Sequence, residues 1–157
     1  MPLPPNERFG PTPTGKAMFS LCEGVDENAK GVGDNVLRLV TLRSHDQYNT
    51  TIYAMDDRYR GVFGRRDILF MNEGDMAQLG LEHGDRVDIT TALPGSMLRL
   101  DDITVVAYSI ASGTVGAYYP EANVLVPLDY LDKESGTPSY KSVPINVTLR
   151  SKEIRAL

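Results

Sequence analysis

The sequence contains few of the residues that carry redox or metal chemistry. It has one cysteine, Cys22, two histidines and no tryptophan in 157 residues. A single cysteine excludes an internal disulfide and the clustered cysteines that hold an iron–sulfur cluster. We therefore expect no iron–sulfur cluster, no metal ligands and no catalytic residues on this chain. The scarcity of cysteine also fits a reducing, cytoplasmic location.

Long apolar segments and an excess of basic charge are also missing. No apolar run approaches the roughly 20 residues that a helix needs to cross a bilayer. Residues 1–6 (MPLPPN) have neither the basic start nor the apolar core of a signal peptide. The formal net charge is −5, whereas a protein that binds nucleic acid usually carries a basic surface. We expect neither a nucleic acid nor a membrane as a partner.

Short β-rich runs separated by glycine and proline predict a mainly-β domain. The chain is long enough for one domain with a real core. Residues 1–34 are rich in proline and glycine and show no sustained period, so we interpret them as an irregular arm or an interdomain linker. Residues 35–157 are predicted to form a closed barrel of short strands with one or two brief helices. The sequence shows no internal repeat.

Alternating apolar residues and turn signals place the elements of this barrel. A helical turn is predicted between Asn72, a capping residue, and Gly80, which would end it. The segment LPGS at residues 93–96 is typical of a tight turn between strands. The predicted strands cover residues 36–43, 50–53, 67–72, 84–90, 103–108, 113–118, 123–126 and 143–149.

The most distinctive segment is the polar run that follows the first predicted strand. Residues 41–50 read TLRSHDQYNT and offer many hydrogen-bonding groups, one permanent cation and one aromatic ring. An arginine can hold a phosphate through two parallel hydrogen bonds, and side-chain amides can bond the edge of a purine-like ring. This mixture suits a large, flat, anionic ligand that is rich in nitrogen and oxygen.

Four segments, in this order, resemble the C-terminal molybdopterin-dinucleotide-binding domain of the molybdopterin oxidoreductases. Along the chain they are the polar run 41–50, residues 72–87 with the pattern N-x2-D-x3-LGL-x2-GD-x-V, residues 118–125 (YYPEANVL) and residues 137–141 (TPSYK). Together they extend over most of residues 36–150. The resemblance implies a six-stranded double-psi β-barrel, the fold that aspartate decarboxylase also has. The cofactor it implies is molybdopterin guanine dinucleotide with molybdenum or tungsten.

Two further segments are similar to one branch of this family. Residues 57–61 (DRYRG) and 64–66 (GRR) resemble the formate-dehydrogenase-like alpha subunits that are linked to acid resistance. Nitrate reductases have an aromatic residue, a histidine and a threonine where this chain has Tyr48, Asn49 and Thr50. The resemblance therefore favours the formate-dehydrogenase-like branch.

The resemblance also implies which residues hold the cofactor. Thr41 and Arg43 would bind pyrophosphate or pterin oxygens, and Lys141 would supply a second cation. Tyr118 would pack near the pterin and Asn123 would bond one of its edges. The remaining implied contacts come from the polar run, in which three residues would line the pterin and two would close the loop by hydrogen bonds: His45, Gln47, Tyr48, Asn49 and Thr50.

The chain cannot carry the whole reaction of such an enzyme. In this family the metal is held by two dithiolenes and by a cysteine, selenocysteine or serine from a different, larger domain. Cys22 lies in no matching motif. We therefore predict a module that binds one or both pterins, is inactive alone, and has the remaining domains or the large subunit of the same oxidoreductase as its partner. The complete enzyme would oxidise a small substrate such as formate by two electrons.

Other interpretations remain open. The chain could be a cofactor-free interaction barrel, or a self-processing pyruvoyl decarboxylase that cleaves itself between Gly95 and Ser96. Arg43 could be a solvated surface charge, and His45 could be an ordinary loop residue. Four arginines in the charged segment after the polar run could clamp a phosphate, contact a larger domain, or pair with nearby aspartates; they are Arg58, Arg60, Arg65 and Arg66.

Overall fold

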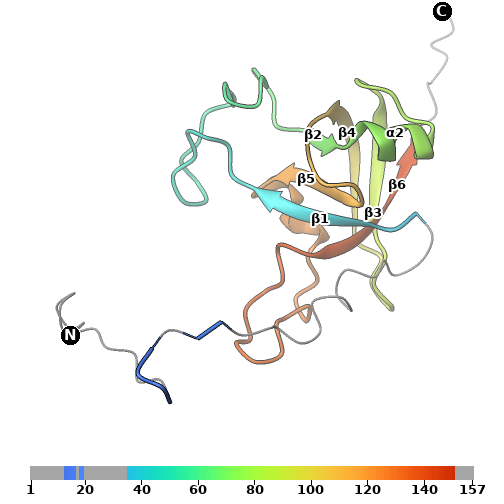
Figure 1. The fold of residues 1–157 in the computed structure, drawn as a ribbon. Helices are drawn as coiled ribbons and strands as arrows, with labels where there is room; N and C mark the ends of the chain where they lie inside the picture. Colours follow the sequence, from blue (N-terminus) through green and yellow to red (C-terminus); the bar gives the residue numbers. More distant parts are fainter. Residues whose placement is uncertain (1–12, 17, 20–34, 151–157) are drawn as a thin grey trace, which may run out of the picture. The chain divides into compact units, whose positions relative to one another are not determined.

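The computed structural model describes residues 13–16, 18–19 and 35–150, and Figure 1 shows the fold. Within these residues six strands close into a barrel in the order β1-β5-β2-β4-β3-β6. Most of the predicted arm over residues 1–34, and Cys22 with it, lies outside the described residues. The strands are β1 (Leu37–Leu42), β2 (Ile68–Met71), β3 (Arg86–Thr91), β4 (Arg99–Ala107), β5 (Thr114–Tyr118) and β6 (Val143–Leu149). The helices within residues 35–150 are α2 (Glu73–Leu79) and the 3-10 helix η2 (Glu121–Leu125).

The barrel has an internal two-fold relation that the sequence does not reveal. Strand β1 pairs in parallel with β5, and β4 pairs in parallel with β2. The antiparallel pairs β1–β6 and β3–β4 correspond in the same way. Exchanging β1, β2 and β3 with β4, β5 and β6 therefore preserves every pairing, and a helix follows both β2 and β5. The prediction of a mainly-β, six-stranded double-psi barrel with short helices is confirmed.

Strand β2 explains why the core has two parts. Its four residues are all buried, although alternate residues of a strand point to opposite faces. Leu69 and Met71 pack in the main core of the barrel. Ile68 and Phe70 belong to a second, smaller cluster that includes Val62, a residue of the long loop between β1 and β2. This loop therefore covers the outer face of the barrel beside β2.

Helix α2 begins and ends where the sequence predicts. The side chain of Asn72 accepts a hydrogen bond from the Gly74 amide at 2.8 Å and donates one to the Ile110 carbonyl at 2.8 Å. Gly80 ends the helix with a φ of 67°, a left-handed conformation that glycine adopts without steric cost. The prediction of a helical turn between Asn72 and Gly80 is confirmed.

Two of the predicted strands are wrong. Residues 123–126 do not form a strand, because the Asn123 amide donates to the Pro120 carbonyl at 2.9 Å and the Val126 amide to the Asn123 carbonyl at 3.0 Å, which are 3-10 bonds. A short apolar run does not by itself distinguish a strand from a buried helical turn. The predicted strand at 50–53 is instead part of a tight reversal, in which Tyr48 and Ile52 form an isolated bridge.

A cluster of ion pairs joins β2, β3 and β4 at one end. The carboxylate of Asp67 accepts hydrogen bonds from Arg65 at 2.8 and 2.6 Å and from Arg86 at 2.7 Å. The bonds from Arg65 are the main reason why the pKa of Asp67 falls from 3.8 to about 2, and Arg86 adds to this against an opposing effect of burial.

This depressed pKa predicts a defined loss of stability in acid. A carboxyl group whose pKa is lower in the folded state stabilises the fold above its unfolded pKa, and this contribution disappears as the pH falls from about 4 towards 2. Thermal unfolding of Asp67→Asn should therefore depend less on pH across this interval than that of the parent protein. The difference should be modest because the Asp67 side chain is 37% exposed, so solvent screens its ion pairs. Parallel curves for the two proteins would contradict the assignment.

Candidate functional site

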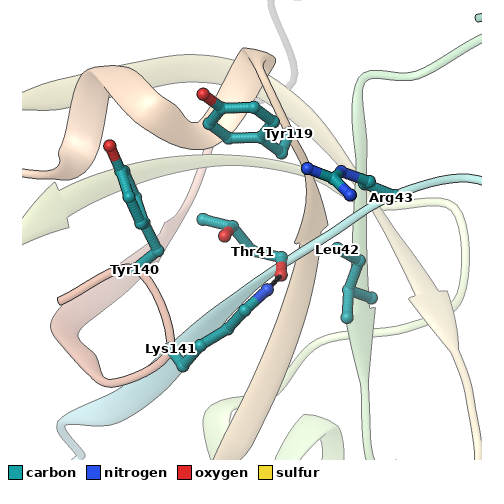
Figure 2. Close-up of a pocket in the computed structure, with 6 residues that line it drawn as sticks. All are labelled: Thr41, Leu42, Arg43, Tyr119, Tyr140 and Lys141. Atoms are coloured by element: carbon teal, nitrogen blue, oxygen red, sulfur yellow. Dashed lines mark hydrogen bonds between the residues drawn. The ribbon is translucent and has the colours of Figure 1, made fainter. Parts of the chain in front are cut away.

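A pocket of about 480 Å³ opens at the carboxyl end of β1 (Figure 2). The pairing of β1 with β5 and with β6 brings the residues that line this pocket together. Leu42 and Tyr118 are partners in the parallel pair β1–β5, so the residues that follow them, Arg43 and Tyr119, leave the two strands at the same end. Because β6 is antiparallel to β1, the residues that precede β6 arrive at that end as well. The pocket is lined by Thr41, Leu42, Arg43, Tyr119, Tyr140 and Lys141.

Backbone and side-chain hydrogen bonds fix the pocket walls. The Thr41 amide donates to the Tyr140 carbonyl at 3.1 Å, and the Tyr119 amide donates to the Leu42 carbonyl at 2.7 Å. The Lys141 ammonium donates to the Thr41 carbonyl, as the dashed line in Figure 2 shows. Tyr119 and Tyr140 meet edge to face, with ring centroids 5.8 Å apart and an interplanar angle of 72°. The pocket therefore has a rigid floor and two aromatic walls.

The pocket carries positive charge that residues 35–150 do not neutralise. Within residues 35–150, no carboxylate lies within ion-pair distance of Arg43 or Lys141. Burial lowers the pKa of Lys141, and the nearby charge of Arg43 lowers it further. An anion bound between the two would relieve this repulsion and accept charge-assisted hydrogen bonds from both. The donors present at this pocket therefore fit a phosphorylated, flat ligand.

Gln47 serves the loop rather than the pocket wall. Its Oε1 accepts from the Ser44 amide at 3.1 Å and from Arg66 at 3.0 Å, and its Nε2 donates to the Tyr119 carbonyl at 2.7 Å. These bonds occupy both ends of the amide with partners inside the protein. The structure places the Gln47 side chain where it holds Tyr119, which lines the pocket. The contact of Gln47 with the pterin stays a prediction.

Arg66 is the centre of this arrangement and was not singled out as a site residue by the sequence. Only 5% of the residue is exposed. Its guanidinium donates to Glu121 at 2.6 Å, to the Ser44 hydroxyl at 2.9 Å and to the Tyr119 carbonyl at 2.8 Å. Its Cζ lies 4.0 Å from the ring centroid of Tyr53 and 4.7 Å from that of Tyr118. Arg66 thus joins the long loop to the segment that follows β5.

The other predicted residues of the polar run lie on the exposed surface of the loop. His45 stacks on Tyr59, with ring centroids 3.7 Å apart. Tyr48 is 73% exposed, and its amide donates to the Ile52 carbonyl at 2.8 Å. Asn49 has a φ of 55°, and its side chain accepts from the Thr50 hydroxyl at 3.2 Å. None of these side chains lines the pocket beside Thr41, so their contact with a cofactor stays a prediction.

Tyr118 and Asn123 also lie away from that pocket. Tyr118 is buried, and its hydroxyl donates to Asp57 at 3.1 Å; burial raises its pKa, and the charge of Asp57 raises it further. The neighbouring Tyr119 lines the pocket instead, as the alternation of side chains along an extended segment allows. Asn123 lines a second pocket of about 620 Å³, together with residues 93–98 and 126–130. Of the ten predicted residues, Thr41, Arg43 and Lys141 line the first pocket.

Each of the four arginines in the charged segment has a carboxylate partner. Arg58 pairs with Asp46 at 3.2 Å, and Arg60 pairs with Asp57 at 2.5 Å. Arg65 and Arg66 pair with Asp67 and Glu121, both at 2.6 Å. Burial opposes the ionisation of Asp57, but the hydrogen bonds from Arg60 and Tyr118 prevail and lower its pKa. This pairing favours internal ion pairs over a phosphate clamp.

In the described part of the chain, no group of three or more histidine, cysteine, aspartate or glutamate side chains could hold a metal ion. The helices found there are too short or too polar to span a lipid bilayer.

Comparison with known proteins places this barrel in a family. Residues 37–144 match the family model described as "Molydopterin dinucleotide binding domain". The match covers more than half of the chain, and the chain belongs to this family.

Two curated relatives match nearly the whole chain. The chain is 43% identical to Protein YdeP of Escherichia coli K12 over 144 residues, which cover 90% of this chain and 19% of YdeP. It is 44% identical to the uncharacterized oxidoreductase Rv2900c of Mycobacterium tuberculosis H37Rv over 155 residues, or 94% of this chain and 19% of that protein. The chain therefore spans about a fifth of the length of the curated relatives it matches.

A solved structure supports the fold. Acetylene hydratase from Pelobacter acetylenicus aligns with a TM-score of 0.55 and 16% sequence identity, over 73% of this chain and 18% of that enzyme. At this identity the likeness concerns the fold alone.

Proposed function

We propose that this chain is the cofactor-binding module of a bis-molybdopterin guanine dinucleotide oxidoreductase, formate-dehydrogenase-like, with the metal ligand and redox centres on other domains. The observation that carries the proposal is the pair of cations Arg43 and Lys141, which have no carboxylate partner within residues 35–150, in a pocket of a domain whose family model is described as binding a molybdopterin dinucleotide. When bound, the cofactor supplies the metal, molybdenum or tungsten, and the electron chemistry.

The chain's own residues would bind and orient the cofactor. Arg43 offers a planar fork of donors that suits a phosphate or a pterin oxygen. Lys141 uses one of its three N–H donors on the Thr41 carbonyl and keeps two for a ligand. Tyr119 and Tyr140 supply ring surfaces with polar hydroxyls at their tips. Because a hydrogen bond to the Thr41 carbonyl already holds the Lys141 ammonium, this group loses little freedom when the cofactor enters.

Removing either cation should lower cofactor content without unfolding the barrel. In the complete enzyme we expect Arg43→Ala and Lys141→Ala each to weaken cofactor binding by about 10- to 100-fold, since a hydrogen bond to a charged group contributes about 1.5–3 kcal/mol. Molybdenum and tungsten are measured by mass spectrometry, and pterin by the fluorescence of its oxidised form. Arg58→Ala is the matched control, because Arg58 is 63% exposed and pairs with Asp46 away from the pocket. Unchanged metal and pterin in both pocket variants would remove the site assignment.

The substrate and the location of the enzyme are part of the same proposal. The similarity of residues 57–61 and 64–66 to formate-dehydrogenase-like alpha subunits supports a two-electron oxidation of a small substrate such as formate. Formate-dependent reduction of an artificial electron acceptor by the complete enzyme tests this part separately. The single cysteine supports a cytoplasmic location and the absence of an iron–sulfur cluster on this chain.

The structure offers no support for self-processing at Gly95 and Ser96. These residues form a turn between β3 and β4, where the Ser96 amide donates to the Leu93 carbonyl at 3.1 Å and Gly95 has a φ of 75°. The Ser96 hydroxyl hydrogen-bonds with the Thr91 hydroxyl at 3.0 Å. The positive φ accounts for the glycine in this turn, and the bond to Thr91 gives the serine hydroxyl a structural partner.

A further inference from the structure

The long loop between β1 and β2, residues 43–67, exposes large apolar side chains. The described part of the chain has fourteen exposed large hydrophobic residues, and six of them lie in this one loop. Exposed apolar residues scattered singly over a surface are ordinary, whereas a concentration of them indicates an interaction site. We name five of the six the apolar patch: Tyr48, Ile52, Met55, Tyr59 and Phe63, which are 73%, 64%, 50%, 66% and 64% exposed.

Contacts within the loop hold its two halves together. The chain forms two small reversals, one closed by the bridge between Tyr48 and Ile52 and the other by the bridge between Asp57 and Val62. The ring of His45 in the first lies 3.7 Å from the ring of Tyr59 in the second, measured between centroids. The ion pair between Arg58 and Asp46 also joins them. Figure 1 shows both reversals extending away from the barrel.

Charged side chains are buried inside the loop, whereas several large apolar side chains are exposed on its surface. Arg66 and Asp57 are 5% and 1% exposed, and they bond to side chains of the loop and of β5. The loop therefore keeps its shape through buried hydrogen bonds and ion pairs. Val62 packs against β2, and the ring of Tyr53 covers Arg66. The side chains of the apolar patch, by contrast, are left mostly exposed.

A partner that covers the apolar patch would bury few charged side chains that lack an ion-pair partner. Covering a charge costs several kilocalories per mole unless it has a partner, and interface centres are depleted in charged residues for this reason. Arg58, Arg60 and Arg65 beside the patch already have carboxylate partners. The patch can therefore lose its water without leaving these arginines uncompensated.

The length of the curated relatives indicates which protein covers the apolar patch. The chain spans about a fifth of the length of the curated relatives it matches, so about four-fifths of each relative lies outside the matching region. The loop starts at Arg43, on the wall of the pocket. A protein surface seated on the patch would lie beside the pocket and could cover the side of a ligand that this barrel leaves open.

We propose that the apolar patch is the docking surface for the large remaining part of a molybdopterin oxidoreductase, whether that part belongs to the same polypeptide or to a separate subunit. The identity of the partner rests on the proposed function. The surface itself rests on the exposure of the five side chains and on the polar interior that holds them in place. Docking there completes the enclosure of the pocket by protein.

Hydroxyl-radical footprinting of the native protein tests this directly. The protein that contains this sequence is purified from its source by a C-terminal tag, labelled and compared with the 157-residue chain expressed alone. We expect the labelling of Tyr48, Tyr59 and Phe63 to fall several-fold in the native protein. Leu128, which is 98% exposed on the second pocket, should react equally in both. The supporting result also requires that oxidoreductase sequence outside this chain is identified in the native sample.

Other results would overturn the proposal. Equal labelling of the patch in both samples, or protection in a species whose mass is that of two copies of this chain, would show that no larger part docks there. Phe63→Asp should restore the labelling of Tyr48 and Tyr59 in the native protein because a carboxylate is costly to bury, and Leu128→Asp should not. Metal and pterin are measured in the same samples. Protection without cofactor would leave the docking surface standing and the cofactor proposal refuted, and cofactor without protection would do the reverse.

Discussion

Replacing Arg66 with methionine is expected to lower the free energy of unfolding by up to about 3–5 kcal/mol, the cost of breaking a fully buried ion pair. Water reaches Glu121, which is 30% exposed, and offsets part of this loss. Arg66 is 5% exposed and is bonded to Glu121, Ser44, Gln47 and the Tyr119 carbonyl. Methionine fills a similar volume but donates no hydrogen bond. Urea denaturation, followed by circular dichroism, measures the difference.

Arg58→Met is the matched control for this prediction. Arg58 carries the same charge in the same loop, but its side chain is 63% exposed and its pair with Asp46 faces solvent. Exposed pairs of this kind contribute at most about 1 kcal/mol. If the two variants lost equal stability, Arg66 would have no special role in holding the loop on the barrel.

Phe70→Ala is expected to cost about 3–5 kcal/mol, the range for truncating a fully buried aromatic residue. Phe70 has no exposed surface and packs against Tyr108 and Tyr118, with ring centroids 5.0 and 5.5 Å away. Alanine would leave a cavity between the barrel and the long loop. Thermal or urea unfolding of the 157-residue chain measures the loss.

Phe63→Ala provides the contrast, since Phe63 is 64% exposed in the same loop. A surface substitution usually changes stability by no more than about 0.5 kcal/mol. The unfolding of the 157-residue chain should therefore barely change in Phe63→Ala. An equal loss in both variants would mean that Phe63 is buried in the isolated chain and is not part of an exposed patch.

Much of the fold follows from local sequence patterns. The helix that begins after Asn72 and ends at Gly80 was predicted because capping and left-handed residues act over one turn of chain. The strand alternation in residues 37–42 is equally local. By contrast, residues 121–125 were predicted in part as a strand, because apolar side chains there contact the core in a 3-10 helix as they would in a strand.

The site was predicted less completely than the fold, for a physical reason. Thr41, Arg43 and Lys141 line the pocket as residues of the segments that resemble the family. The function of Gln47 depends on Arg66 and Tyr119, which are 19 and 72 residues away along the chain. Which of Tyr118 and Tyr119 faces inward depends on the register between β1 and β5. No pattern within either segment records these long-range contacts.

The antiparallel pairing of the first and last strands has a consequence for how the barrel connects to other protein. Leu37 at the start of β1 lies opposite Ile145, and β6 continues past it to Leu149. Within residues 35–150 the chain therefore begins and ends at one pole of the barrel, and the pocket with Arg43 and Lys141 opens at the other. Under the proposed function, other domains joined to this barrel at the first pole would leave the opposite pole of residues 35–150 to the cofactor.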